Sequence, residues 1–102
     1  MEEYDIGFAT PGAEQEFERY FSRLAAKVAR QVRDGIEGLR HSPRPPGKSF
    51  KVLRPPLAIL QRVANYRLRI GDHRVLYDVD DKAHRVILIA VRLRSERTYR
   101  KR

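Results

Sequence analysis

The sequence contains no cysteine and no tryptophan, and its 102 residues include only three histidines. Without cysteine the chain can form neither a disulfide framework nor a thiolate nucleophile. The histidines, His41, His73 and His84, are scattered along the chain. We therefore expect no zinc site, and no motif indicates a cofactor.

Long apolar runs are also absent. No stretch approaches the roughly 18 consecutive apolar residues of a membrane-spanning helix, and the N-terminal segment MEEYDIGF lacks the basic-then-apolar order of a signal peptide. We expect a cytoplasmic protein with no membrane partner. The length, with 41% hydrophobic residues, predicts a single domain over residues 1–102 with one modest core.

Acidic residues are scarce beyond the first twenty positions. Residues 1–20 hold six acidic side chains and one basic one, so their formal charge is −5, and the other 82 residues carry +14 of the total of +9. Such an asymmetry favours a polyanionic partner, either a nucleic acid or an acidic protein. A basic soluble domain without such a partner is the plain alternative.

The segment 65–79, NYRLRIGDHRVLYDV, reads as two alternating strands joined by Gly71-Asp72. Glycine at the first central position suits a type II′ hairpin turn. If Ile70 pairs with His73, then Arg69 lies opposite Arg74. Side chains alternate between faces along a strand, which predicts a core face made of Tyr66, Leu68, Ile70, His73, Val75, Tyr77 and Val79.

The opposite face of this hairpin carries charge. Its members are Arg67, Arg69, Arg74, Leu76 and Asp78. Directly opposed like charges destabilise a sheet by roughly a few tenths of a kcal/mol or more, so folding alone gives no reason for the Arg69–Arg74 pair. Binding of an anion, most simply a phosphate, would give a reason for this pair.

Earlier in the chain, Tyr4–Phe8 predicts a short first strand, and Thr10-Pro11 predicts a helix start with threonine as N-cap. One helix from Pro11 to Arg40 would measure about 45 Å at roughly 1.5 Å per residue, which is too long for a domain of ~100 residues. A helical hairpin that breaks near Leu24–Lys27 is the compact solution. Its apolar stripes are Phe17, Tyr20, Phe21, Leu24 and Val28, Val32, Ile36, Leu39. Either close packing on a sheet or simple tolerance would explain Gly35 and Gly38 in the second helix.

After the helices, His41-Ser42-Pro43 is expected to end the second helix, and Arg44-Pro45-Pro46-Gly47 predicts an extended connector. Phe50–Leu53 predicts an edge strand that Pro55-Pro56 ends, and Leu57–Val63 is ambiguous between a helical turn and an added strand. Val86–Val91 is apolar without alternation, which indicates a central strand covered on both faces. A basic tail is expected from Arg92 to Arg102.

Together these segments predict an α+β fold in two layers. An N-terminal strand and a helical hairpin precede three to four antiparallel strands. The helices cover one face of the sheet, and the arginine face of the hairpin is left open.

Three motifs resemble those of the RelE/ParE toxins of bacterial type II toxin–antitoxin systems, more closely the RelE branch. They are SPRPPG, YRLRIGDHRVLYDVDD and AVRLRSERTYR. The resemblance implies a RelE-like domain held inactive by a small acidic antitoxin. It also implies the ribosome and messenger RNA as partners, and leaves open operator DNA bound through the toxin–antitoxin complex. RelE-type toxins cleave messenger RNA in the ribosomal A site, whereas ParE-type toxins poison DNA gyrase.

The same resemblance assigns site residues by motif. They are Arg67 and Arg69 before the turn, Arg74 after it, and Arg94 and Tyr99 near the C-terminus. Leu93 departs from the pattern, since many relatives have His or Lys there, and the connection between Leu53 and Tyr66 is several residues longer than usual.

Metal-independent RNA cleavage needs a base, an acid and cations around the phosphate. Arginine suits the last role, because it holds phosphate oxygens bidentately and stays protonated. Tyr99 is the candidate for proton transfer. Asp78 is better explained as a salt-bridge partner of Arg67, and His73 as a core residue. Tyr66 and Tyr77 are better explained by core packing than by base stacking. The alternatives are a gyrase inhibitor without nuclease activity and a non-catalytic nucleic-acid-binding module.

Overall fold

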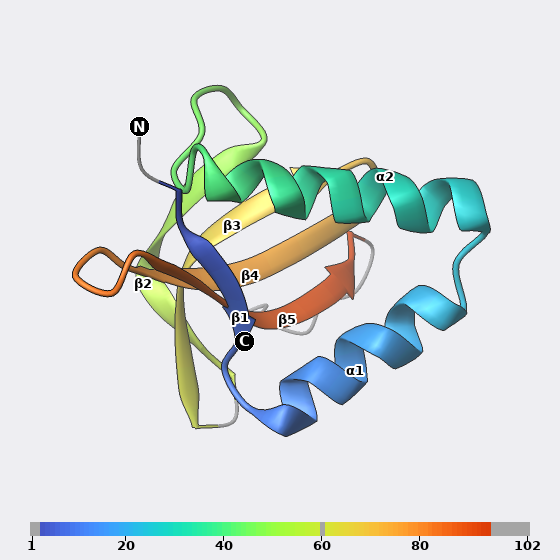
Figure 1. Cartoon of the computed structure of the whole chain (residues 1–102), viewed down its shortest axis with the longest axis horizontal. Helices are drawn as coiled ribbons and strands as arrows, with labels where there is room; N and C mark the ends of the chain where they lie inside the picture. The colour runs from blue at the N-terminus through green and yellow to red at the C-terminus, as the bar shows by residue number, and fades with distance from the viewer. Residues whose placement is uncertain (1–2, 60, 95–102) are drawn as a thin grey trace.

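The computed structural model describes residues 3–59 and 61–94 of the chain. The elements in order are β1 (Asp5–Phe8), α1 (Pro11–Ser22), α2 (Ala26–Glu37), a 3₁₀ turn η1 (Gly38–Arg40), β2 (Phe50–Ile59), β3 (Arg62–Ile70), β4 (His73–Asp80) and β5 (Arg85–Leu93). The strands form one sheet in the order β1-β5-β4-β3-β2 (Figure 1). β1 runs parallel to β5, and the other neighbours are antiparallel. The predicted α+β fold is confirmed.

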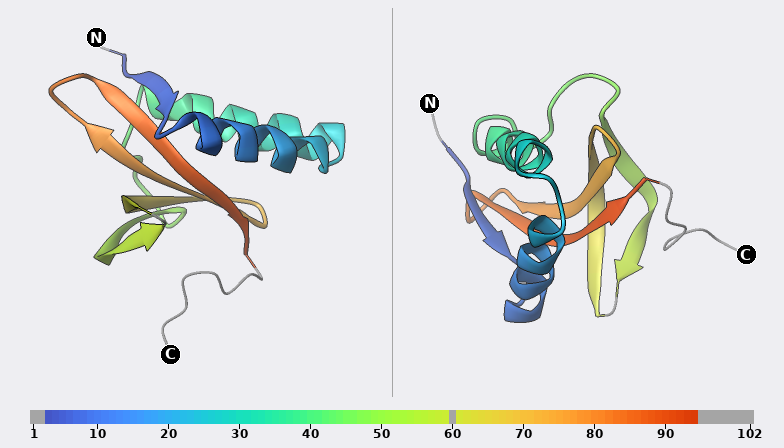
Figure 2. Two further views of the ribbon diagram at one scale, coloured as in Figure 1. Left: turned by 90° about the horizontal axis from the view of Figure 1, so that it is seen from below. Right: turned by 90° about the vertical axis from the view of Figure 1, so that its right-hand side faces the viewer.

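The two helices form the predicted hairpin. The Thr10 hydroxyl accepts a hydrogen bond from the Ala13 amide at 3.0 Å, and Pro11 follows it at the first helical position. This satisfies one of the amides that a helix N-terminus leaves without an intrahelical partner. The break between α1 and α2 overlaps the predicted one. Both helices lie on the same side of the sheet (Figure 2).

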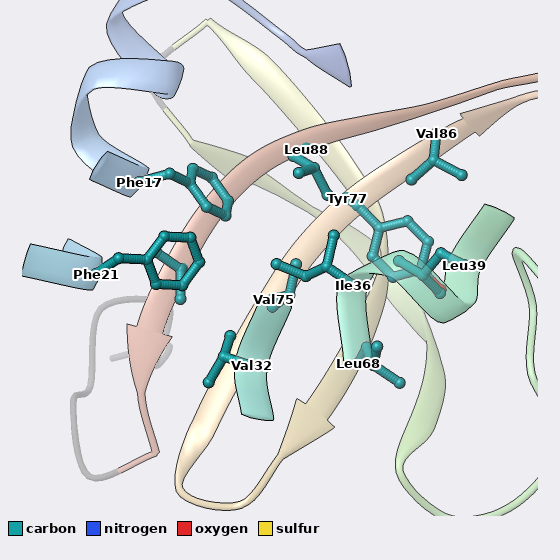
Figure 3. Close-up of a cluster of buried hydrophobic side chains, with 11 residues drawn as sticks. Phe17, Phe21, Val32, Ile36, Leu39, Leu68, Val75, Tyr77, Val86 and Leu88 are labelled. Carbon is teal, nitrogen blue, oxygen red and sulfur yellow. The ribbon is translucent and has the colours of Figure 1, made fainter. Parts of the chain in front are cut away.

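The main core lies between the helices and the sheet. Phe17 and Phe21 from α1 and Val32 and Ile36 from α2 meet the sheet residues Leu68, Val75, Tyr77, Val86, Leu88 and Val91 (Figure 3). The two apolar stripes of the helices therefore face the core, as predicted. Tyr77 is completely buried and donates its hydroxyl hydrogen to the Pro43 carbonyl at 2.7 Å. Tyr77 is thus a core residue.

A bulge in β5 explains why this strand lacks alternation. Leu76 pairs with Ala90 and Tyr77 with Leu88, so Ile89 is an extra residue between them. An extra residue shifts the alternation of the following side chains by one position. Ile89 and Ala90 therefore both join Ala64 and Leu76 in a second buried cluster. β5 is a central strand with apolar contacts on both faces, as predicted.

This second cluster corrects the expectation that the arginine face is open. Leu76 is only 1% exposed, because Leu53, Leu57 and Ile59 of β2 pack against the cluster on that face. The sheet twists so strongly that β2 turns away from the direction of β5 (Figure 2). The arginines therefore border a covered apolar patch instead of lying on a bare sheet.

The prediction that Pro55-Pro56 ends the strand is wrong. β2 continues to Ile59, and its pairing with β3 shifts register between Val52 and Leu57, where the prolines lie. Proline lacks an amide hydrogen, but an edge strand has one side that needs no partner. Leu57–Ile59 is thus an added strand segment and not a helical turn.

The predicted basic tail also begins too early, since β5 runs through Leu93 and takes Arg92 into the sheet. Residues 95–102 lie outside the described residues. Within the described residues, no helix is both long and apolar enough to cross a membrane.

Gly35 lets α2 approach β3 closely. A Cβ atom at Gly35 would lie 2.5 Å from Cδ1 and 2.8 Å from Cγ1 of Ile70, whereas one at Gly38 would have no neighbour within 4 Å. The predicted packing reason therefore holds for Gly35 and not for Gly38.

We expect Gly35→Ala to lower the free energy of unfolding by about 1 kcal/mol. Overpacking costs about 1–3 kcal/mol, which exceeds the ~0.8–1.0 kcal/mol that alanine gains in helix propensity. Gly38→Ala is the matched control and should be neutral or stabilising by about 0.4–1 kcal/mol. Urea denaturation of both variants measures the difference, and equal stabilities would contradict the close approach.

Candidate nucleic-acid interface

The hairpin turn sets the register of the charged face. Gly71 has a positive φ of 58°, and Asp72 does not have a positive φ, as a type II′ turn requires. Ile70 pairs with His73, and Arg69 with Arg74, as predicted. The like-charged pair is therefore a direct consequence of this two-residue turn.

The neighbouring strand extends this pair into a row. Arg92 of β5 lies opposite Arg74 of β4, which lies opposite Arg69 of β3. We call these three residues the arginine row. Adjacent strands are about 4.8 Å apart, so three cationic side chains start side by side on the face away from the helices. Each of the three residues is partly buried. Arg92 was not among the site residues predicted from the sequence, and its register with Arg74 identifies it.

Arg67 lies on the same face, two residues before Arg69 on β3. Its guanidinium donates toward the carbonyls of Lys48 and Ser49, each at 3.4 Å. The Nε atoms of Arg67 and Arg74 are shielded from solvent. The guanidinium groups of these two residues are therefore partly desolvated. An anion interacts more strongly with a partly desolvated cation than with one in bulk water.

Arg94 lies beside the hairpin turn. Its amide donates to the Asp72 carbonyl at 2.6 Å, which holds the end of β5 against the β3–β4 connection. The structure therefore brings Arg67, Arg69 and Arg74 to one face and places Arg94 at the end of that face. Tyr99, the fifth predicted residue, lies outside the described residues.

Two other candidate side chains have structural partners. Asp78 accepts hydrogen bonds from the Asn65 amide group at 2.9 Å and from the Val79 backbone amide at 2.8 Å. It does not pair with Arg67, so its predicted salt bridge is wrong. His73 is 7% exposed on the helix side of β4, where its Nδ1 lies 2.8 Å from the Tyr20 hydroxyl. His73 is thus on the face opposite the arginine row. In the described ranges, no three His, Asp or Glu side chains are grouped as metal ligands.

A network around Arg44 was not predicted from the sequence. The Arg44 guanidinium contacts both carboxylate oxygens of Asp81, at 2.9 and 3.2 Å, and donates from Nε to the Tyr66 hydroxyl at 3.0 Å. Tyr4 donates to the same carboxylate at 2.7 Å. These bonds tie the connector after the helices to the far end of the β4–β5 hairpin. The Arg in SPRPPG therefore has a bracing role that no local pattern reveals.

The network also shifts the pKa values of the groups that it joins. The hydrogen bonds from Arg44 and then Tyr4 lower the pKa of the Asp81 carboxyl group. Conversely, the hydrogen bond to Asp81 raises the pKa of Arg44. On the buried side of the connector, desolvation raises the pKa of Tyr77. Tyr77 and Arg44 therefore keep their protons, and their hydrogen-bond donors, at any physiological pH.

A groove of about 940 Å³ lies between the first turns of α1 and the β2–β3 connection. Ala9, Arg62 and Ile89 line it, and they also line an adjoining hollow of about 340 Å³. Because Arg62 begins β3 and Arg69 lies near its end, the groove is at the opposite end of the strand from the arginine row. Neither hollow was predicted from the sequence.

A helical hairpin on one face of a five-stranded mixed sheet is a RelE-like fold, and solved structures agree. They include the archaeal RelE–RelB complex from Pyrococcus horikoshii OT3 (TM-score 0.66, 20% identity, 91% of this chain and 97% of that chain). The toxin–antitoxin complex RelBE2 from Mycobacterium tuberculosis is also similar (TM-score 0.63, 24% identity, 94% and 97%). So is the YoeB dimer from Staphylococcus aureus (TM-score 0.59, 20% identity, 86% and 93%).

The family follows from the sequence. A family model described as the ParE toxin of the type II toxin–antitoxin system parDE matches residues 8–98. The chain therefore belongs to this toxin family and is the toxin of a toxin–antitoxin system. No curated protein matches the sequence.

The Asp81 network predicts a pH-dependent stability. Because the folded-state pKa of Asp81 is lowered, its stabilisation is present above the unfolded pKa of about 3.9 and is lost as the pH falls through the folded value. We expect Asp81→Asn to lower the thermal midpoint at pH 7, and the deficit to shrink below about pH 4. Thermal unfolding across a pH series measures it. Asp72→Asn, at the exposed hairpin turn, is the control, and a deficit that is constant with pH would contradict the ionic role.

Proposed function

We propose that this toxin is a metal-independent endoribonuclease that cleaves messenger RNA in the ribosomal A site. The observation that supports this most is the arginine row. Three like charges in register on adjacent strands oppose folding, so a polyanionic ligand is the simplest reason for their presence. The match of the fold to RelE-like toxins, and the motif resemblance to the RelE branch, point to RNA as that ligand.

The proposed reaction uses the substrate's own 2′-hydroxyl as nucleophile. The 2′-hydroxyl gives its proton to a base and its oxygen attacks the adjacent phosphorus, while the bond to the 5′ oxygen breaks. An acid protonates the 5′ oxygen, which leaves as a 5′-hydroxyl, and a 2′,3′-cyclic phosphate remains on the other fragment. Negative charge grows on the phosphate oxygens in the transition state. Arg69, Arg74 and Arg92 supply fixed cationic donors there, with Arg67 and Arg94 at the margins. Electrostatic stabilisation of this kind is usually the largest single contribution to catalysis.

Proton transfer is the part that arginine performs poorly, because its pKa stays above about 12. We assign this role to Tyr99 on the strength of the motif resemblance. A tyrosine hydroxyl has an unperturbed pKa near 10, and cationic neighbours favour its ionised form. His73 is excluded from direct contact with a ligand on the arginine row, since its ring lies on the helix side of β4.

A second candidate function is gyrase inhibition without RNA cleavage. The family model that matches is the ParE model, and Leu93 stands where many RelE-type relatives have His or Lys. Leu93 is 39% exposed and is paired with His73 at the end of β5. In this function the arginine row would bind an acidic or nucleic-acid surface of the gyrase complex.

The proposed partner in the resting state is an acidic antitoxin that covers the arginine row. Complementary charge would speed its association and would block the substrate site at once. Relatives of known structure were solved as toxin–antitoxin complexes. We place the toxin in the cytoplasm, where ribosomes and gyrase both are, and extend the partners to operator DNA bound through the complex.

Substitution of the arginine row should separate function from folding. We expect Arg69→Gln and Arg92→Gln each to abolish growth arrest, because each removes a cationic hydrogen-bond donor to the phosphate. Their thermal midpoints should be unchanged or slightly higher, since a repulsion of roughly a few tenths of a kcal/mol is relieved. Lys27→Gln on the exposed face of α2 is the matched control and should stay toxic. Toxic row variants, or a large loss of stability, would contradict a functional role for the row.

The nature of the activity is tested with programmed ribosomes under single-turnover conditions. We expect the wild-type toxin to cleave the message and Tyr99→Phe to slow cleavage by about 10²–10⁴-fold, the usual contribution of acid–base catalysis, while ribosome binding is retained. A wild-type rate in Tyr99→Phe would refute its role. No cleavage by the wild-type protein, together with gyrase-linked DNA breaks in cells, would establish the second function.

A further inference from the structure

A fifth sheet cation, Lys51, lies on the arginine face. In the β2–β3 ladder, Lys51 is opposite Arg67 and Phe50 is opposite Leu68. Phe50 packs on the helix side, where its ring stacks on Tyr66 with centroids 5.6 Å apart. Alternation then puts Lys51 on the other face, as it does Leu53, which packs against the second cluster. Lys51 is exposed on the edge strand.

The cations on this face follow a bent path. The arginine row crosses β5, β4 and β3, but the next row along the strands is different. Opposite Arg67 on β4 is Leu76, which is 1% exposed, and beyond it on β5 is Ala90, also 1% exposed. Only the β3 and β2 positions of this second row carry charge. The path therefore turns at β3 and leaves toward Lys51.

The spacing of the two rows suits successive phosphates of one strand. Arg67 and Arg69 are two residues apart on β3, which is about 6.8 Å along a strand. Phosphates in a stacked strand are about 3.4 Å apart along the axis, and an extended strand with splayed bases separates them further. One extended nucleotide step can thus place one phosphate on each row.

We infer that Lys51 and Arg67 form a second phosphate subsite, and that the bound single-stranded RNA runs along β3 from the arginine row toward β2. This inference rests on the proposed RNA-directed function and adds the path of the substrate to it. The buried Leu76 and Ala90 exclude a path that continues over β4 and β5, because they would leave a charged phosphate without a cation and partly desolvated. Lys51 acts here as a substrate-binding residue, remote from bond cleavage.

The test uses two 2′-O-methyl ligands, which cannot be cleaved: UpU with one phosphate and UpUpU with two. Binding is measured by NMR titration of the full chain. We expect Lys51→Gln to weaken UpUpU several-fold and to leave UpU unchanged. Arg92→Gln should weaken both. Lys82→Gln, at the exposed turn between β4 and β5, is the matched control and should weaken neither.

Salt dependence gives an independent readout. With a longer 2′-O-methyl oligonucleotide, each phosphate contact contributes about 0.7 to the slope of log K against log salt concentration for a single strand. Lys51→Gln should lower the magnitude of this slope by about that amount, and its thermal midpoint should match the wild type. Lys82→Gln should keep the wild-type slope.

The outcomes separate the inference from the proposed function. Lys51→Gln with wild-type affinity for UpUpU, while Arg92→Gln weakens it, would overturn the second subsite and leave the RNA-directed function standing. Equal weakening of UpU and UpUpU by Lys51→Gln would also overturn the subsite. If Lys51→Gln weakened antitoxin binding but not oligonucleotide binding, Lys51 would belong to the site for an acidic protein partner, and the subsite would be overturned. No binding of the wild-type protein to any of these oligonucleotides would overturn the subsite, whereas cleavage on programmed ribosomes decides the proposed function separately.

Discussion

The pairing of β3 with β4 through the Gly71-Asp72 turn is the constraint on which the site depends. A positive φ at Gly71 closes the hairpin with two residues, and this loop length fixes which side chains face each other. A slip of one residue would exchange Tyr77 and Leu76 between the two faces of the sheet and would carry the arginines into the helix-side core. Because Tyr77 and Val75 are completely buried on that side, the core and the turn specify the same register. The packing of apolar side chains on the helix side of the sheet therefore keeps the arginines in register on the other side.

The arginine row places like charges next to each other, and the fold compensates around it. The second apolar cluster lies directly beside the row on the same face, where Leu76 and Ala90 of the sheet meet Leu53 and Leu57 of β2. Its burial is favourable by about 25 cal/mol per Å² of apolar surface, which offsets a repulsion of a few tenths of a kcal/mol per opposed pair. On the same face, the Nε atoms of Arg67 and Arg74 are shielded from water. Cations in such a setting attract a phosphate more strongly than solvated ones, so in the proposed function the apolar patch would contribute to phosphate binding as well as to stability.

Two braces keep the ends of the charged face in place. At one end the Arg94 amide binds the Asp72 carbonyl, which joins β5 to the hairpin turn beside the row. At the other end Arg44 binds Asp81 and Tyr66, which joins the connector after the helices to the β4–β5 turn and to β3. Gly35 adds a third restraint, because α2 lies against Ile70, the last residue of β3 before the turn. The arginine row is thus carried by strands that are fixed from both ends and from the helix side, and the proposed anion site requires such preorganisation.

Local sequence determined the elements that depend on short-range rules. The capped start of α1 at Thr10-Pro11, the apolar stripes of the helices, the β3–β4 register and the identity of β5 as a central strand all follow from periodicity and turn chemistry over a few residues, and the structure bears them out. Three of the five predicted site residues, Arg67, Arg69 and Arg74, share one face for the same reason. What local patterns could not supply was long-range: the bulge at Ile89, the continuation of β2 past Pro55-Pro56, and the positions of Arg92, Lys51 and Arg44. These depend on which strand lies beside which, and on burial summed over the whole sheet. Alternation within one strand says on which face a residue lies, and only the assembled sheet decides which residues meet there.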